Sequence, residues 1–159
     1  MAYDRLVLIN AQGLDIFQAR TQSVVSGGAF VRAASGALPN ALSSGASNAG
    51  GYKENTVQVD VTSTSGTAIA PVGIAMFTAG SNATLSFARK GDFVLPAAGA
   101  VAAGDFLQSS QSGTNYGYVS VLDNFIGSAA STYDGVHRVI GRAYTAAADG
   151  GFAVVRLDL

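Results

Sequence analysis

The amino-acid sequence predicts an all-β fold, a compact β-sandwich or barrel of about eight to ten short strands with little helix. Three features carry this prediction. Apolar and polar residues alternate in short segments, clusters of glycine, serine and asparagine separate these segments, and glycine interrupts the alanine-rich stretches. The chain has 159 residues and no cysteine, so one domain can bury a core and no disulfide contributes to it.

Alternation with a period of two is clearest in Thr56–Val61, where Val57, Val59 and Val61 share one face. The longest apolar stretch, Ala68–Phe77, is too short to cross a bilayer, so we expect a core segment there and no membrane span. Further strands are expected, in chain order, at Leu6–Ile9, Gly28–Arg32, Leu85–Arg89, Phe93–Leu95, Tyr116–Leu122, Arg138–Tyr144 and Phe152–Leu159. Glycine breaks the alanine clusters Ala97–Ala103 and Ala146–Ala148, so each holds at most one helical turn.

Two segments match each other in spacing. Val72–Ala75 followed by Ala79 corresponds to Ile140–Ala143 followed by Ala147, and each leads through a turn into another apolar strand. Glycine inside a strand marks a bulge or a close approach of backbone. The match predicts two similar β-hairpins.

Glycine, serine and alanine dominate Ser35–Lys53, which predicts a long loop and a candidate contact segment. Asn124–Gly135 is expected to form a second loop. We divide the chain into residues 1–22, which form an N-terminal arm or the first strands, and residues 23–159, which form a single β-rich domain with the long loop at 35–53.

Charge and residue types argue against several functions. Nine Lys and Arg against ten Asp and Glu give a net charge of −1, so we expect no nucleic-acid partner. His137 is the only histidine, which with the absence of cysteine predicts no metal site and no cofactor. Asp92 and Asp105 each follow a glycine and precede a phenylalanine, a pattern typical of turns. No nucleophile or phosphate-binding motif is complete, so we do not expect an enzyme.

The stretch Pro71–Leu107 resembles the small capsid decoration, or cement, proteins of tailed bacteriophages. The resemblance rests on three short segments, Val72–Ala75, Gly91–Pro96 and Gly104–Leu107, and on a closing hairpin over Ile140–Leu157. Together these cover about half of the chain. Residues Met1–Gln22 and the 35–53 loop have no counterpart in the pattern.

The resemblance implies a non-enzymatic structural protein that is made in the host cytoplasm and binds the outer surface of an assembled phage capsid. There it would act as a homotrimer that clamps neighbouring major capsid protein subunits and stabilises the shell. Three other hypotheses for the function stay open: a carbohydrate-binding or adhesion module of a phage tail or cell surface, a tail-tube subunit, and a hydrolase that uses Asp92 or Asp105 with His137.

For attachment we expect an arm, Ala2–Gln12, that adds a strand to a neighbouring chain. An ordinary first strand of the protein's own sheet is the alternative, and the sequence does not separate the two. The candidate capsid or inter-subunit contacts are Tyr3, Arg5, Leu6, Leu8, Ile9, Leu38, Leu42 and Tyr52.

Overall fold

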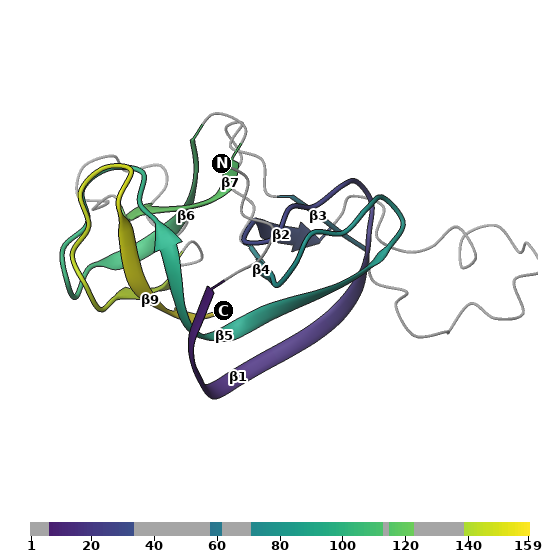
Figure 1. Ribbon diagram of the computed structural model, residues 1–159, viewed down its shortest axis with the longest axis horizontal. Helices are drawn as coiled ribbons and strands as arrows, with labels where there is room; N and C mark the ends of the chain where they lie inside the picture. The colour runs from purple at the N-terminus through teal and green to yellow at the C-terminus, as the bar shows by residue number, and fades with distance from the viewer. Residues whose placement is uncertain (1–6, 34–57, 62–70, 113–114, 123–138) are drawn as a thin grey trace, which may run out of the picture.

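The computed structural model describes residues 7–33, 58–61, 71–112, 115–122 and 139–159, and these hold nine strands and no helix (Figure 1). The predicted all-β class is confirmed. No helix of the described residues is long and apolar enough to cross a membrane. The strands are β1 (Val7–Thr21), β2 (Phe30–Ala33), β3 (Gln58–Val61), β4 (Gly73–Ala75), β5 (Thr84–Pro96), β6 (Phe106–Ser112), β7 (Asn115–Val121), β8 (Val139–Ala143) and β9 (Phe152–Asp158).

Some elements differ from the sequence prediction. The segments Leu85–Arg89 and Phe93–Leu95, expected as two strands, are parts of the single strand β5. The first strand runs on to Thr21, well beyond the predicted Leu6–Ile9. Strand β6 was not among the strands predicted from the alternation of apolar and polar residues. The expected loops Ser35–Lys53 and Asn124–Gly135 lie outside the described residues.

The first part of the sheet closes into a ring of five strands. Neighbouring strands pair in the order β1–β3–β2–β4–β5, and an additional pairing joins β5 back to β1. The β1–β3 pair is parallel, whereas the other four pairs of this ring are antiparallel. Closure satisfies the backbone hydrogen bonds that an open sheet leaves at its edges. We call β1, β3, β2, β4 and the first half of β5 the first ring.

The second half of β5 begins another ring. From β5 the order continues through β9, β8, β6 and β7 in antiparallel pairs. A parallel bridge between Ala97 and Val119 then joins β7 back to the end of β5, where the N–H of Ala98 donates to the carbonyl of Val119. We call this group the second ring. Because β5 belongs to both rings, it fixes one beside the other.

The shared ribbon of β1 and β5 bends between the two rings. Val7–Asn10 pair with the half of β5 after Gly91, and Asp15–Arg20 pair with the half before it. The register shifts in between, where Gly13 has a φ of 74° and Gly91 a φ of 140°. Residues with a side chain rarely adopt these conformations. Figure 1 shows the sharp corner in β1 that results.

The two rings repeat the same pairing pattern. The pairs β1–β5, β4–β5, β2–β4 and β2–β3 of the first ring correspond in chain order to β5–β9, β8–β9, β6–β8 and β6–β7 of the second. Phe30 lies opposite Ile74 in the first ring, and Phe106 lies opposite Arg142 at the corresponding place in the second. The two segments that match in sequence form β4 and β8, each paired with the next strand. The predicted pair of similar hairpins is therefore confirmed.

Each ring contributes its own buried side chains. The smaller cluster fills the first ring. The larger cluster fills the second ring and also takes in Phe30, Ile74 and Ala88 from the outer face of the first. The smaller cluster comprises Ala19, Val25, Ala29, Val31, Ala75, Ala79, Leu85 and Phe87, and the rest of the larger one comprises Phe93, Leu95, Ala97, Val101, Leu107, Val119, Ile140, Ala143, Ala153, Val155 and Leu157.

Thr21, at the end of β1, is a buried polar residue whose hydroxyl holds the turn before β5. Its oxygen accepts a hydrogen bond of 3.0 Å from the N–H of Ala83, and its proton is donated to the carbonyl of Gly80. Thr21→Val keeps the shape but leaves both groups without this partner. We expect a loss of about 1–3 kcal/mol in the free energy of unfolding, measured by urea denaturation. Thr21→Ser, which keeps the hydroxyl, should lose less, and equal losses would contradict the assignment.

Candidate functional site

The carboxylates named as candidate catalytic groups have structural partners. Asp92 lies in the middle of β5, not in a turn, so the turn interpretation of this residue is wrong. Its side chain is 9% exposed and its Oδ1 accepts a hydrogen bond of 3.1 Å from Nη1 of Arg156 on β9. The local sequence pattern gave the wrong interpretation because Asp92 pairs with Arg156, which lies on β9. A motif of three residues carries no information on which distant strand is the neighbour of β5.

Asp105 confirms the turn interpretation. Its Oδ2 accepts a hydrogen bond of 2.8 Å from the N–H of Ala102, and its own N–H donates to the carbonyl of Ala102. His137 lies outside the described residues. Within the described part of the chain no three acidic or histidine side chains gather as metal ligands would.

A row of charged and aromatic residues crosses the second ring. Asp92 on β5 lies opposite Arg156 on β9, Arg156 lies opposite Arg142 on β8, and Arg142 lies opposite Phe106 on β6. Like charges placed directly opposite each other on neighbouring strands destabilise a sheet. In this row the two arginines, Arg142 and Arg156, lie on neighbouring strands, and only one carboxylate, that of Asp92, lies in the same row.

The two arginines of the row have different partners. The hydrogen bond and the negative charge of Asp92 raise the pKa of the Arg156 guanidinium above its ordinary value. Folding therefore favours the charged form, and this contribution is complete below the pKa of unfolded arginine and is lost only as the pH rises through the still higher folded value. The guanidinium of Arg142 instead lies over the ring of Phe106, 4.1 Å from its centroid.

Three described aromatic side chains of the second ring are exposed, Phe106 within this row and two others outside it. Phe106 is 47% exposed, Tyr144 on the segment after β8 is 55% exposed, and Phe152 at the start of β9 is 49% exposed. Residues two apart in a strand point to the same side of a sheet, so Phe152 shares its face with Arg156, while Val155 between them points into the core. We call Phe106, Arg142, Tyr144, Phe152 and Arg156 together the arginine–aromatic face.

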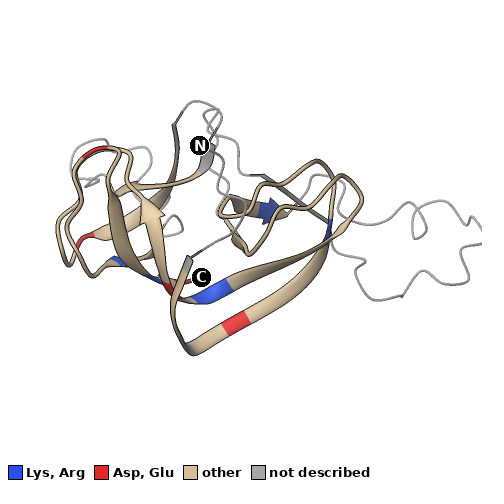
Figure 2. Ribbon diagram, in the orientation of Figure 1, with Lys and Arg blue, Asp and Glu red and all other residues tan. Residues whose placement is uncertain are grey.

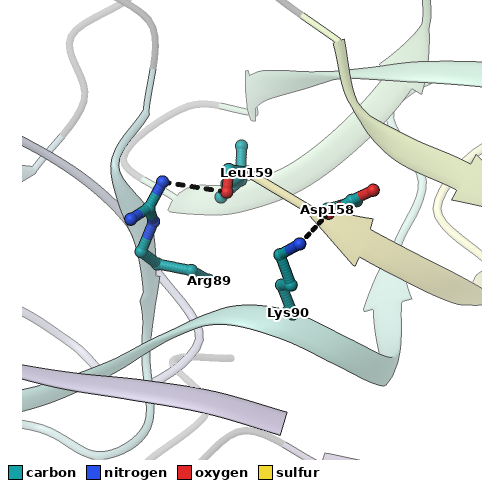
Figure 3. Close-up of polar contacts among 4 residues, drawn as sticks. All are labelled: Arg89, Lys90, Asp158 and Leu159. Atoms are coloured by element: carbon teal, nitrogen blue, oxygen red, sulfur yellow. Dashed lines mark hydrogen bonds and ion pairs between the residues drawn. The ribbon is translucent and has the colours of Figure 1, made fainter. Parts of the chain in front are cut away.

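Other cations near the junction of the rings are used within the fold. Arg89 donates to the carbonyl oxygen of Leu159 at 3.0 Å, and Lys90 pairs with Asp158 at 2.9 Å; Figure 3 shows the two contacts side by side. Arg89 also lies 5.3 Å from the ring centroid of Phe17. These contacts hold the end of β9 beside the middle of β5. Figure 2 shows that charged positions are sparse along the described ribbons.

The candidate contacts inferred from the sequence fall mostly outside the described residues. This applies to Tyr3, Arg5, Leu6, Leu38, Leu42 and Tyr52. Leu8 packs against the larger core cluster, and Ile9 is exposed. In the structure Val7–Asn10 pair with β5 of the same chain, which is the arrangement of an ordinary first strand.

Sequence reasoning did not single out the arginine–aromatic face. Arg142 and Tyr144 alternate with Ala143, as Phe152 and Arg156 do with buried neighbours, and this period of two was a usable signal. It assigns each side chain to one face of its own strand. Which strands adjoin, and therefore which side chains meet, depends on the register between strands far apart in sequence.

Replacing the two partners of the half-buried Asp92–Arg156 ion pair tests its role. Arg156→Met leaves the Asp92 carboxylate buried without its cation, so we expect a lower melting temperature. Asp92→Asn should then stabilise the Arg156→Met protein, because it removes an unpaired charge, yet destabilise the wild type. Thermal denaturation of the four proteins checks this. The same sign for Asp92→Asn in both backgrounds would show that the pair does not act as described.

Comparison with known proteins gives a likeness in fold but none in sequence. No family model matches the chain, and no curated protein matches it in sequence. Among solved structures, the chain is similar to the N base of the head fibre gp8.5 of bacteriophage phi29, with a TM-score of 0.54 and 12% sequence identity. The match covers 91% of this chain and 94% of that one. The likeness therefore spans almost the whole of both chains.

Proposed function

We propose that this chain is a structural protein of a bacteriophage virion that binds the outer surface of the capsid and stabilises it by clamping neighbouring major capsid protein subunits. The observation that carries the proposal is the likeness in fold to the N base of a phage head fibre over nearly the full length of both chains. The resemblance of Pro71–Leu107 to capsid decoration proteins points to the same class of protein. The homotrimeric state is part of this proposal.

The chemistry of the described residues supports a binding role without catalysis. The carboxylates of Asp92 and Asp105 are engaged by Arg156 and by the N–H of Ala102, respectively. Charged residues make up 12% of the chain, so covering its surface costs little desolvation. Copies packed closely on a shell would also repel each other weakly, since the net charge is −1.

Binding to purified phage heads tests the proposal. Heads of the phage that encodes the chain, prepared without it, are incubated with the full-length protein, pelleted and imaged by electron cryomicroscopy. We expect co-sedimentation that saturates, extra density at regular positions on the outer surface, and heads that resist heat better. Protein that stays in the supernatant at every concentration, or density only inside the heads, would refute the proposal. Analytical ultracentrifugation of the free protein tests the homotrimer.

A further inference from the structure

We propose that the arginine–aromatic face is the surface through which this protein docks on its partner, and that the partner presents a carboxylate-bearing protein surface to it. This inference rests on the proposed function, because it names the surface and the chemistry by which the chain would bind a shell. It follows from the internal repeat, from the exposure of the face and from the charges on it.

The repeat identifies what this face corresponds to. The first ring contains an equivalent row, whose residues pair from strand to strand in the same way. Its members Ile16, Ala88, Ile74 and Phe30 correspond to Asp92, Arg156, Arg142 and Phe106 of the second ring. Ile16 lies opposite Ala88, Ala88 opposite Ile74, and Ile74 opposite Phe30.

In the first ring this outer face is already an interface. Phe30, Ile74 and Ala88 are fully buried and belong to the core cluster of the second ring, which therefore covers them. The two rings are also in close backbone contact. A Cβ added at Gly117 of β7, in the second ring, would lie 2.3 Å from the carbonyl oxygen of Gly28, just before β2 of the first ring. The fold thus uses this face of its sheet once as a packing surface within the chain.

In the second ring the described residues of the same face are only partly covered. Phe106, Tyr144 and Phe152 each expose about half of their surface. Aromatic side chains and arginine are enriched at the centres of protein–protein interfaces, where they contribute most of the binding energy. A partner bound to this face of the second ring would therefore lie where the second ring lies against the first.

The charges indicate what kind of partner fits. Ile74 of the first ring is replaced at the equivalent position by Arg142, and Ala88 by Arg156. Asp92 pairs with Arg156, whereas among the described residues Arg142 contacts the Phe106 ring and no carboxylate. A guanidinium fork binds a carboxylate through two parallel hydrogen bonds. A long polyanion fits less well, because the chain as a whole has a net charge of −1.

The test compares charge reversal on the face with charge reversal elsewhere. Arg142→Glu is matched by Arg20→Glu, which makes the same change on β1, where Arg20 is exposed and donates to the carbonyl of Asn82. In the head co-sedimentation assay we expect Arg142→Glu to weaken binding about a hundredfold and Arg20→Glu about twofold or less. Arg142→Lys should fall in between, because an ammonium lacks the planar fork. Thermal denaturation confirms that each variant is folded.

A second assay separates this inference from the proposed function. A hexaglutamate peptide is titrated into the full chain and followed by NMR, with a single-stranded DNA oligonucleotide as the alternative anion. We expect peptide-induced shifts centred on Arg142 and Phe106 that Arg142→Glu abolishes. If wild-type protein fails to bind heads, the proposed function is refuted and the peptide assay alone decides the inference.

Three results would overturn the inference. One is a folded Arg142→Glu protein that binds heads, or shifts with the peptide, as the wild type does. Another is a change in oligomeric state on Arg142→Glu with head binding retained, which would make the face a contact between copies of the chain. The third is stronger displacement of the NMR signals of the face by DNA than by the peptide.

Discussion

Gly141→Ala is expected to destabilise the protein by about 4 kcal/mol or more, enough to unfold a marginally stable domain. Gly141 has a φ of 157° at the point where β8 shifts register, since Leu107 pairs with Gly141 and Gln108 with Val139. A Cβ at this position would lie 1.8 Å from the carbonyl oxygen of Arg156. The clash is with backbone, so a side-chain rotation does not relieve it, and strain in φ adds to its cost.

A matched glycine controls for the general effect of adding a methyl group. A Cβ at Gly80 meets no atom within 4 Å, and its φ lies outside the left-handed region. We expect Gly80→Ala to change stability by about 0.5 kcal/mol or less. Circular dichroism during heating measures both proteins, and the Gly141→Ala midpoint should be lower by about 10 °C or more. A Gly141→Ala protein that melts with the control would show that β8 and β9 are not packed this closely.

The fold class was predictable because it depends on a local pattern. Residues two apart share a face, so the alternation in Phe152–Leu159 and in Tyr116–Leu122 identifies strands whatever the rest of the chain does. The two similar hairpins were also predictable from a local pattern. Glycine and alanine recur at the same spacing in both segments, and glycine inside a strand marks a close approach of neighbouring backbones. These features require no knowledge of which strands are neighbours.

Strand lengths were less predictable where polar or small residues occur inside a strand. Gly91 and Asp92 interrupt the apolar pattern of β5, yet the strand continues through them because Asp92 pairs with Arg156. The alternation pattern missed strand β6 because Gln108–Ser112 shows no apolar alternation. Its backbone is held by β7 and β8 on either side, and this tertiary pairing overrides weak local propensity.

The arginine–aromatic face depends on register and could not be predicted from any single segment. Phe106 and Arg142 meet because β6 and β8 are neighbours, and Arg142 and Arg156 meet because β8 and β9 are. Comparing the two repeats shows how this face differs from its counterpart in the first ring. Ile74 and Phe30 of the first ring are apolar where the second ring covers them, while the equivalent positions in the second ring hold Arg142 and an exposed Phe106.

Gly117→Ala tests the contact between the rings on which that comparison depends. A Cβ at Gly117 would lie 2.3 Å from the carbonyl oxygen of Gly28, where ordinary contacts begin at 3.4 Å, so β7 and the turn before β2 must separate by about 1 Å. The N–H of Gly28 is bonded to the carbonyl of Ala75, which resists this movement. We expect a loss of about 1–3 kcal/mol in the free energy of unfolding, measured by urea denaturation.

The location of the damage distinguishes this variant from Gly141→Ala. Separation of the rings should expose Phe30 and Ile74 while leaving the pairings within each ring in place. Hydrogen exchange measured by mass spectrometry should therefore speed up most in β2 and β4 of the Gly117→Ala protein, with β9 near its wild-type rate. Because the second ring covers those strands only if the rings are packed as described, unchanged exchange in β2 and β4 would argue that the outer face of the first ring is not an interface.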